Sequence, residues 1–264
     1  MLLTALLLGI VEGATEFLPI SSTGHLILAG WLVGFQGNKA ATFEIFIQLG
    51  AILAVMWVYR HKLWKLCANR SETHFAGRRG LYLLAITTVP ALIFGFLLHG
   101  VIKRYLFNPL TVAIGLLVGG IAMLLIERKA NEESKLGLDD LTRKEALSIG
   151  LAQVLALFPG VSRSGATIMG GLAVGINRET AVEYSFLAAV PIMLAATGYD
   201  LLKALPSLSG SDVPFFAVGL ISTFVSALIV VRWLLKYVRQ HNFVPFAWYR
   251  IGLALIIFTS LALR

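Results

Sequence analysis

The stretch EGATEFLPISSTGH, residues 12–25, decides how the rest of this sequence is interpreted. It places two glutamates, two serines, a threonine and a histidine beside apolar runs. Glu12 and Glu16 have the i, i+4 spacing that puts both side chains on one face of a helix. Two carboxylates so placed repel each other unless a cation, a metal ion or a proton lies beside them. The stretch therefore predicts a functional site.

The composition predicts a membrane protein. Of the 264 residues, 58% are hydrophobic and 14% are charged, whereas soluble domains average about 45–50% and about 25%. Burial of an ionisable side chain at membrane depth costs free energy, and such residues are usually functional. The ionisable residues within 12–25 are therefore the main candidates for a functional site. The formal net charge of +8 would suit a nucleic-acid partner. We expect no such partner, because the basic residues occupy short loops between apolar segments, where they set membrane topology.

Six stretches are long enough to cross a hydrocarbon core of roughly 30 Å. Two other stretches, 1–35 and 146–176, each contain two shorter apolar runs, interrupted at Pro19 and at Pro159. Each short run can enter a bilayer but not cross it, so we expect two re-entrant helical hairpins. The N-terminus lacks a basic segment before its apolar run, and we expect it to remain in the mature protein. The predicted spans are 41–59, 80–100, 110–127, 180–203, 213–236 and 244–263.

The two interrupted stretches resemble each other in sequence. Both carry G-x-x-[EQ] followed by F-x-x-x-S-x-[ST]-G, at an offset of 141 residues. We interpret this as an internal duplication, with repeat 1 at 1–127, a linker at 128–145 and repeat 2 at 146–264. Each repeat has an odd number of spans, so the second repeat is inverted relative to the first. The predicted fold is therefore an all-α membrane protein whose site lies where the two hairpin tips meet.

The distribution of charge predicts the orientation of the chain. Fifteen Lys and Arg residues fall on one side of the predicted spans and five on the other. The positive-inside rule assigns the first side to the cytoplasm. Both termini and the first hairpin then belong to the outer face, and the site opens to that side. Arg163 and Arg250 are assigned to neither side. Arg163, at the tip of the second hairpin, is the one cation that this threading places deep in the membrane.

The second hairpin contains SRSGAT, residues 162–167, whose chemistry suits an anion. The Arg163 guanidinium either pairs with Glu12 or Glu16 as a structural contact, or holds phosphate through its planar fork of donors. A helix that begins at each hairpin tip would present free N–H groups to the same anion. Hydroxyl donors that would add to this site are Ser162, Ser164, Thr167, Ser21 and Thr23.

The first hairpin supplies a candidate nucleophile. Ser22 carries a hydroxyl, and His25 lies close enough in sequence to act on it as a general acid or base. One of the three consecutive hydroxyl residues at 21–23 is expected to cap the following helix. Glu12 and Glu16 either bind a divalent cation or provide a base. Residues that lie in or near spans, and that either support the site or occupy an interfacial position, are Glu44, Gln48 and Glu183.

The paired motifs EGxTEFLPxSSTGH and PGxSRSGAT resemble those of the bacterial undecaprenyl-diphosphate phosphatases, the bacitracin-resistance type of membrane enzyme. The resemblance covers essentially the whole chain, including FEIFIQLGAILAV and EYSFLAAVP. It implies hydrolysis of undecaprenyl diphosphate to the monophosphate and inorganic phosphate at the outer face of the inner membrane. This reaction would recycle the lipid carrier of peptidoglycan and cell-wall synthesis and confer resistance to bacitracin. The resemblance also implies stimulation by Mg²⁺ or Ca²⁺.

The residues and the resemblance together give a hypothesis for the reaction. Ser22 attacks the terminal phosphorus of the lipid diphosphate, His25 relays protons, and Arg163 with its neighbouring hydroxyls holds the phosphates. A flippase or transporter for polyprenyl phosphate is the alternative, because inverted repeats with broken helices are typical of alternating access. The expected partners are the polyprenyl diphosphate and the lipid bilayer. The oligomeric state stays open, with a homodimer as one alternative.

Overall fold

The computed structural model describes residues 1–67, 75–106, 108–130, 137–204 and 209–263. Within these ranges the chain forms helices and turns without strands, which confirms the predicted all-α fold. The α-helices are α1 (Leu2–Thr15), α2 (Ser22–Leu32), α3 (Asn38–Val58), α4 (Arg60–Cys67), α5 (Gly77–Val101), α6 (Pro109–Lys129), α7 (Arg143–Leu155), α8 (Arg163–Ala173), α9 (Arg178–Ala204), α10 (Val213–Tyr237) and α11 (Val244–Ala262). Shorter elements are the π-helix η1 (Ile102–Leu106) and the 3-10 helices η2 (Leu138–Asp140) and η4 (Gly210–Asp212).

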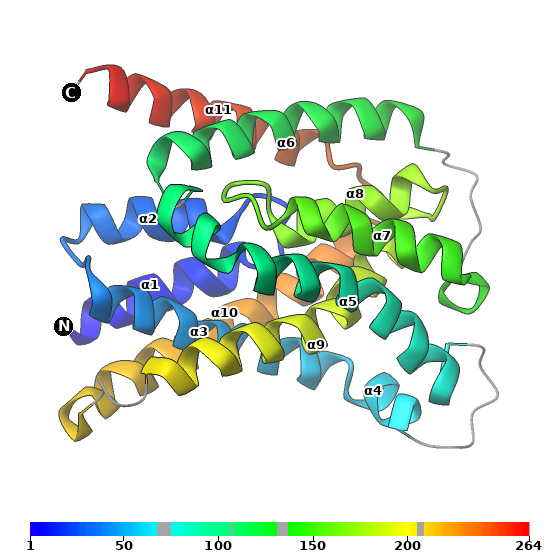
Figure 1. Cartoon of the computed structure of the whole chain (residues 1–264), viewed down its shortest axis with the longest axis horizontal. Coiled ribbons are helices and arrows are strands. Elements are labelled where there is room, and N and C mark those ends of the chain that lie inside the picture. Colours follow the sequence, from blue (N-terminus) through cyan, green and yellow to red (C-terminus); the bar gives the residue numbers. More distant parts are fainter. Residues whose placement is uncertain (68–74, 107, 131–136, 205–208, 264) are drawn as a thin grey trace.

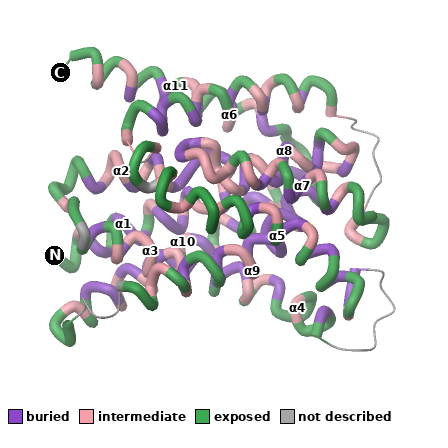
Figure 2. Tube along the Cα trace, viewed as in Figure 1, coloured by how far each residue is buried: buried purple, intermediate pink, exposed green. Residues whose placement is uncertain are grey.

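Six of the described helices are long and apolar enough to cross a membrane, and they coincide with the six predicted spans. Exposed residues line the outer sides of the bundle (Figure 2). Many are large and apolar, such as Phe96 on α5, which is 76% exposed, and Ile229 on α10, which is 63% exposed. Such surfaces are unfavourable in water and suit a lipid environment. The candidate spans are Lys39–Val58, Gly77–Val101, Pro109–Lys129, Arg178–Lys203, Gly210–Tyr237 and Val244–Ala262.

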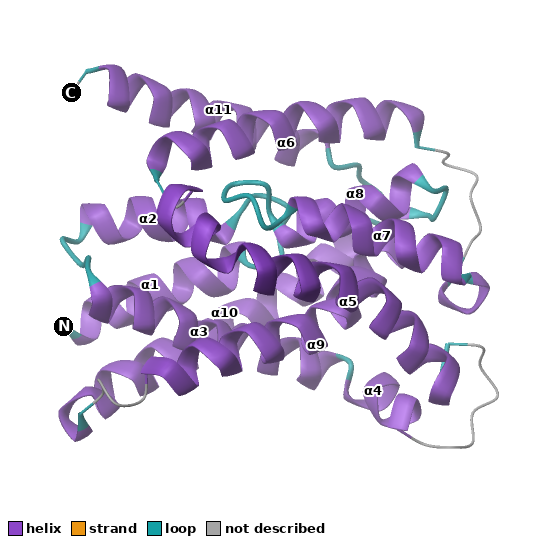
Figure 3. Ribbon diagram, viewed as in Figure 1, coloured by secondary structure: helices purple, strands orange, loops and turns teal. Residues whose placement is uncertain are grey.

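The two interrupted stretches each form a pair of short helices, α1 with α2 and α7 with α8. The longest of the four is α1, with 14 residues, which at 1.5 Å per residue is too short to cross a bilayer. Each pair folds back on itself, and the joining turns lie near the middle of the molecule (Figure 3). The outer ends of α1 and α2 lie at the same end as both termini, and those of α7 and α8 lie at the opposite end (Figure 1).

The predicted division into two repeats and a linker stays a prediction. Residues 131–136 of the predicted linker 128–145 lie outside the described residues. Within the described ranges, η2 and the start of α7 follow this gap.

Glycines allow the short helices to pack closely against long helices from the other half of the chain. A Cβ atom added to Gly13 of α1 would lie 2.8 Å from the amide nitrogen of Ala227 on α10. One added to Gly150 of α7 would lie 2.9 Å from the carbonyl oxygen of Thr87 on α5. Real Cβ atoms essentially never approach other atoms so closely. Small residues at these contacts therefore set the distance between helices, as in membrane helix packing generally.

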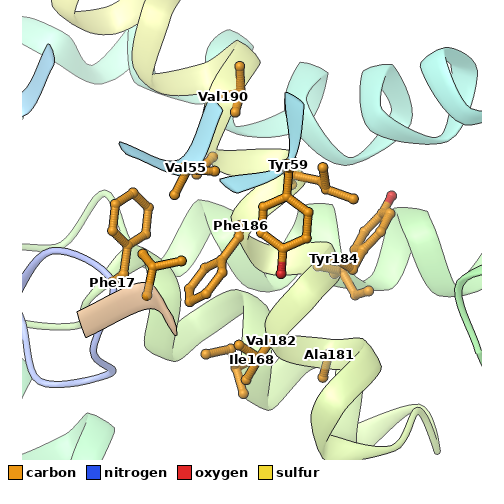
Figure 4. Packing of buried hydrophobic residues seen from close by; sticks show 14 of the residues in the cluster. Phe17, Val55, Tyr59, Ile168, Ala181, Val182, Tyr184, Phe186 and Val190 are labelled. Atoms are coloured by element: carbon orange, nitrogen blue, oxygen red, sulfur yellow. The ribbon is translucent and has the colours of Figure 1, made fainter. Parts of the chain in front are cut away.

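A buried aromatic cluster fixes the turn between α1 and α2. Figure 4 shows Phe17, Phe186 and Tyr59 close together in this core. The rings of Phe17 and Phe186 pack edge to face with centroids 5.2 Å apart, and both side chains are fully buried. Such pairs contribute about 0.5–1.5 kcal/mol beyond the burial of their area. Because Phe17 is anchored on α9 in this way, its neighbour Glu16 is held at the centre of the molecule.

We expect Gly13→Leu to lower the melting temperature of the detergent-purified protein, because the added side chain must push α1 away from α10. Overpacking of this kind costs about 1–3 kcal/mol. Gly252→Leu is the control, because a Cβ at Gly252 on the exposed face of α11 would meet no other atom within 4 Å. Equal losses of melting temperature in the two variants would contradict the proposed close contact.

Candidate active site

Two turns, residues 16–21 and 156–162, meet at the centre of the molecule (Figure 3). They are joined through the start of α8, where the Ser164 hydroxyl donates to the Leu18 carbonyl oxygen of the first turn at 2.9 Å. Each turn ends in a serine with positive φ, 70° at Ser21 and 72° at Ser162, and the described chain contains no other such residue besides glycines. This conformation costs about 1–3 kcal/mol per residue and persists only where the surroundings enforce it. Matching strain at both turns marks them as functional candidates.

A carboxylate, a hydroxyl and a guanidinium from the two turns contact one another. The Ser22 hydroxyl donates to Glu16 Oε2 at 2.5 Å. On the other side, Arg163 Nη2 donates to Glu16 Oε1 at 3.3 Å and forms a partly buried ion pair with it. Glu16 thus joins the first residue of α2 to the first residue of α8. The sequence predicted that these residues would lie together, and the structure places them in contact.

Arg163 is positioned by more than Glu16. Its guanidinium lies over the Phe17 ring, 5.4 Å from the centroid, and Nη1 donates to the Ser185 carbonyl oxygen at 3.2 Å. The Nε atom is buried without a hydrogen-bond partner. Both interpretations of Arg163 are compatible with this geometry, since the ion pair with Glu16 leaves a donor for an anion. Ser185 and Phe17 are contacts that the sequence analysis did not identify.

Glu12 lies one turn before Glu16 on α1 and is completely buried. Both of its carboxylate oxygens lack a hydrogen-bond partner, and its charge is repelled by Glu16 and Glu44 and attracted by Arg163. A buried carboxylate in this state needs a cation or a proton. No group of three or more His, Cys, Asp or Glu side chains in the described residues could hold a metal ion. Glu12 therefore fits a divalent cation only if phosphate oxygens and water provide most of the ligands.

The predicted hydroxyl donors of the second turn already have partners within the protein. Ser162 Oγ accepts from the Gly165 amide at 3.1 Å and caps α8. Thr167 Oγ1 donates to the Arg163 carbonyl oxygen at 2.9 Å and lies 2.6 Å from Ser185 Oγ. Ser162, Ser164 and Thr167 therefore hold the turn in shape. Their predicted contact with a diphosphate stays a prediction.

The first turn of α2 is arranged differently. Ser21 makes no side-chain cap hydrogen bond, so the first amides of α2 have no side-chain acceptor and can face an anion. Thr23 is half-buried in the same helical turn. The predicted role of His25 is to act as a general acid or base on Ser22, which requires a hydrogen bond between the two side chains. In this structure both residues have other partners. His25 Nδ1 lies 2.7 Å from the Ser21 carbonyl oxygen and its Nε2 lies 2.7 Å from the Tyr249 hydroxyl.

The three residues predicted to support the site are in different places. Glu44 on α3 is near Glu12, and Gln48 Oε1 accepts from the Thr197 hydroxyl of α9 at 3.3 Å. Glu183 instead forms an ion pair with Lys62 of α4. It lines a separate cavity of about 340 Å³ at the other end of α9. The structure therefore does not bring Glu183 together with the other candidates.

Arg250 of α11 corrects the expectation that Arg163 is the one deeply placed cation. It is only 1% exposed, and its acceptors in the described structure are backbone carbonyl oxygens. It donates from Nη1 to Pro19 in the first turn at 3.1 Å. From Nη2 it donates to Gly160 and Val161 in the second turn, at 3.0 and 2.8 Å. In the sequence, Arg250 lies inside the predicted span 244–263, and the count of charges assigned it to neither side of the membrane.

Comparison with known proteins agrees with the motifs. The family described as "Bacitracin resistance protein BacA" matches residues 5–256. An undecaprenyl-diphosphatase of Desulfovibrio desulfuricans is 55% identical over 257 residues, covering 97% of each chain. One from Nitratidesulfovibrio vulgaris is 52% identical, covering 99% of this chain and 98% of its own. Undecaprenyl-diphosphatase 1 of Bacillus anthracis is 51% identical with the same coverage. The chain belongs to the bacitracin resistance protein BacA family, as its paired motifs predicted.

Proposed function

We propose that this protein hydrolyses undecaprenyl diphosphate to undecaprenyl phosphate and inorganic phosphate, and thereby recycles the lipid carrier of cell-wall synthesis. The observation that carries this proposal is the contact of Ser22, Glu16 and Arg163 across the two turns. A nucleophile, a base and an anion-binding group in mutual contact are what phosphoryl transfer requires. The relatives named above are diphosphatases, so the alternative of a polyprenyl-phosphate flippase is not supported.

The geometry supports a reaction in two steps. Ser22 Oγ attacks the terminal phosphorus while Glu16, which already accepts its hydrogen bond at 2.5 Å, takes the proton. The bond from this phosphorus to the bridging oxygen breaks, and undecaprenyl phosphate leaves. Water then hydrolyses the phosphoserine, which releases inorganic phosphate and restores Ser22. Arg163 moves from Glu16 to the phosphate oxygens, where its fixed charge stabilises the transition state.

His25 and the divalent cation have narrower roles in this proposal. His25 sits one turn into α2, and its link to Tyr249 would carry protons to or from the leaving group. Glu12, whose carboxylate oxygens have no hydrogen-bond partner, would hold Mg²⁺ or Ca²⁺ together with phosphate oxygens and water, while Glu16 acts as the base. When bound, the cation would neutralise charge on the diphosphate. The protein's own residues align the nucleophile and the phosphates.

We further propose that the two short-helix pairs are re-entrant hairpins of two inverted repeats. The packing supports this, because the relationship between halves is reciprocal: α1 packs on α10, and α7 packs on α5. The offset between Ser21 and Ser162, the serines with positive φ, is the same 141 residues that relates the sequence motifs. Inverted repeats place a site at the midplane, where broken helices meet.

We expect Ser22→Ala, Glu16→Gln and Arg163→Lys each to abolish most phosphate release from a C55 prenyl diphosphate by the purified protein. Loss of the nucleophile predicts a fall in kcat of at least about 10³-fold. Loss of the base or of the bidentate guanidinium predicts about 10²–10³-fold. Ser260→Ala, near the end of α11, is the control and keeps wild-type activity. Addition of EDTA tests whether a divalent cation takes part.

Two results would contradict the roles assigned here. One is a phosphohistidine at His25 trapped during turnover while Ser22→Ala remains active. The other is undiminished phosphate release by Arg163→Lys. Absence of phosphate release from the wild type, together with binding of the lipid that requires Arg163, would instead favour transport.

The basic end of the molecule is proposed to face the cytoplasm, with the active site open to the periplasm. The sole cysteine, Cys67, is exposed at the end of α4 on this basic side. We expect a membrane-impermeant maleimide to label Cys67 in inside-out vesicles but not in right-side-out vesicles. A Gln36→Cys, Cys67→Ser variant carries its thiol in the turn after α2 and should give the reverse pattern. Labelling of Cys67 in right-side-out vesicles would overturn the proposed orientation.

A further inference from the structure

A groove of about 880 Å³ lies between the beginnings of α5 and α7, away from the two central turns. Four of its lining side chains are cationic: Arg78 and Arg79 from α5, and Arg143 and Lys144 from α7. The other residues that line it are Tyr82, Leu83, Leu141 and Thr142. The lining therefore combines a dense positive charge with apolar and hydroxyl groups, and the described residues that line it include no carboxylate.

Among the described residues, the acidic side chains nearest in sequence to the groove accept hydrogen bonds from backbone amides. Asp139 accepts a hydrogen bond from the Phe75 amide at 2.9 Å, and Asp140 accepts one from the Gly137 amide at 2.9 Å. Glu145 accepts from the Thr142 amide and hydroxyl in a capping box at the start of α7. Each carboxylate thus terminates a local backbone turn. Glu145 also attracts Lys144 and so offsets part of one positive charge, but none of these three carboxylates lines the groove itself.

The shape of the groove is fixed by the cations themselves. Arg79 donates to the carbonyl oxygens of Asp139 and Leu141, at 3.1 and 2.7 Å, and so ties the segment before α7 to α5. The Arg143 guanidinium lies over the Tyr82 ring, 5.1 Å from its centroid. The two helices also begin here, and helix N-termini add positive potential. The site is therefore preformed for an anion.

An apolar surface continues from the groove along both helices. Leu81 on α5 is 47% exposed, and Leu147 and Leu151 on α7 are 45% and 54% exposed. The groove also lies at the first residues of the candidate span Gly77–Val101, which is where a bilayer's headgroups meet its hydrocarbon. A ligand with a phosphate at the groove and acyl chains along α5 and α7 would match both surfaces.

We infer that this groove binds the phosphate headgroup of an anionic phospholipid, with its acyl chains against α5 and α7. Basic pockets between membrane helices are suited to such headgroups. The site is distinct from the proposed active site, and its occupancy would fix the position of α7 relative to α5. Because α7 leads directly into the second central turn, the bound lipid would stabilise the arrangement of that turn.

The test compares binding of dioleoylphosphatidylglycerol and dioleoylphosphatidylcholine to the detergent-purified full chain by native mass spectrometry. Each basic residue near a membrane surface contributes about 1 kcal/mol to binding of an anionic lipid. Arg78→Gln with Arg143→Gln should therefore weaken phosphatidylglycerol binding about 30-fold. The matched control is Arg232→Gln with Lys236→Gln, which removes the same charge from exposed positions on α10 and should leave binding unchanged. Arg78→Lys with Arg143→Lys should retain binding.

Three results would overturn the inference. The first is an equal loss of binding in both glutamine pairs, which would indicate a general effect of charge. The second is equal affinity of the wild type for the two lipids. The third is displacement of phosphatidylglycerol by an equal concentration of glycerol 3-phosphate, which would make the groove a site for a soluble phosphate. Melting temperatures of all variants show whether each remains folded.

Discussion

The buried guanidinium of Arg250 is the interaction on which the central site depends. Carbonyl groups in the two turns have no helical partner, and lipid cannot provide a donor. Arg250 supplies donors to Pro19 in one turn and to Gly160 and Val161 in the other. It is anchored on α6 as well, through the Gly115 carbonyl oxygen at 3.1 Å. One cation thus satisfies the backbone of both turns and fixes their relative position.

In this arrangement Arg250 packs closely against the start of α8, and several residues of the two turns are held in unfavourable states. A Cβ atom added at Gly165 would lie 2.9 Å from Arg250 Nη1, so glycine at the start of α8 leaves room for the guanidinium. Ser21 and Ser162 adopt positive φ, and Glu12 is buried without a hydrogen-bond partner. Each of these features is unfavourable alone. They persist because the packing around the turns holds them in place, and their concentration in one region is typical of a functional site.

Much of the fold could be predicted because bilayer thickness fixes the length of an apolar span. The contact between Glu16, Ser22 and Arg163 was also foreseen, since the paired motifs lie at the tips of two short-helix pairs. The partner of His25 was not, because Tyr249 is 224 residues away and meets it through the packing of α11. The sequence left Glu183 between a supporting role and an interfacial position, because a residue near the end of a span has no defined rotational register; the structure pairs it with Lys62. Arg250 was noticed as an unassigned charge, but its acceptors are backbone groups, which have no sequence signature.

The kinetics of Arg250→Lys test most directly whether one guanidinium holds the two turns in register. Lysine keeps the charge but lacks the planar fork that reaches both turns. A misplacement of about 1 Å from a residue outside the chemistry can cost about 10²-fold in rate. We therefore predict that kcat for phosphate release falls about 10²-fold or more in folded Arg250→Lys. The control Arg232→Lys, at an exposed position on α10, should keep the wild-type kcat. Wild-type kcat in folded Arg250→Lys would contradict the central role given to this residue.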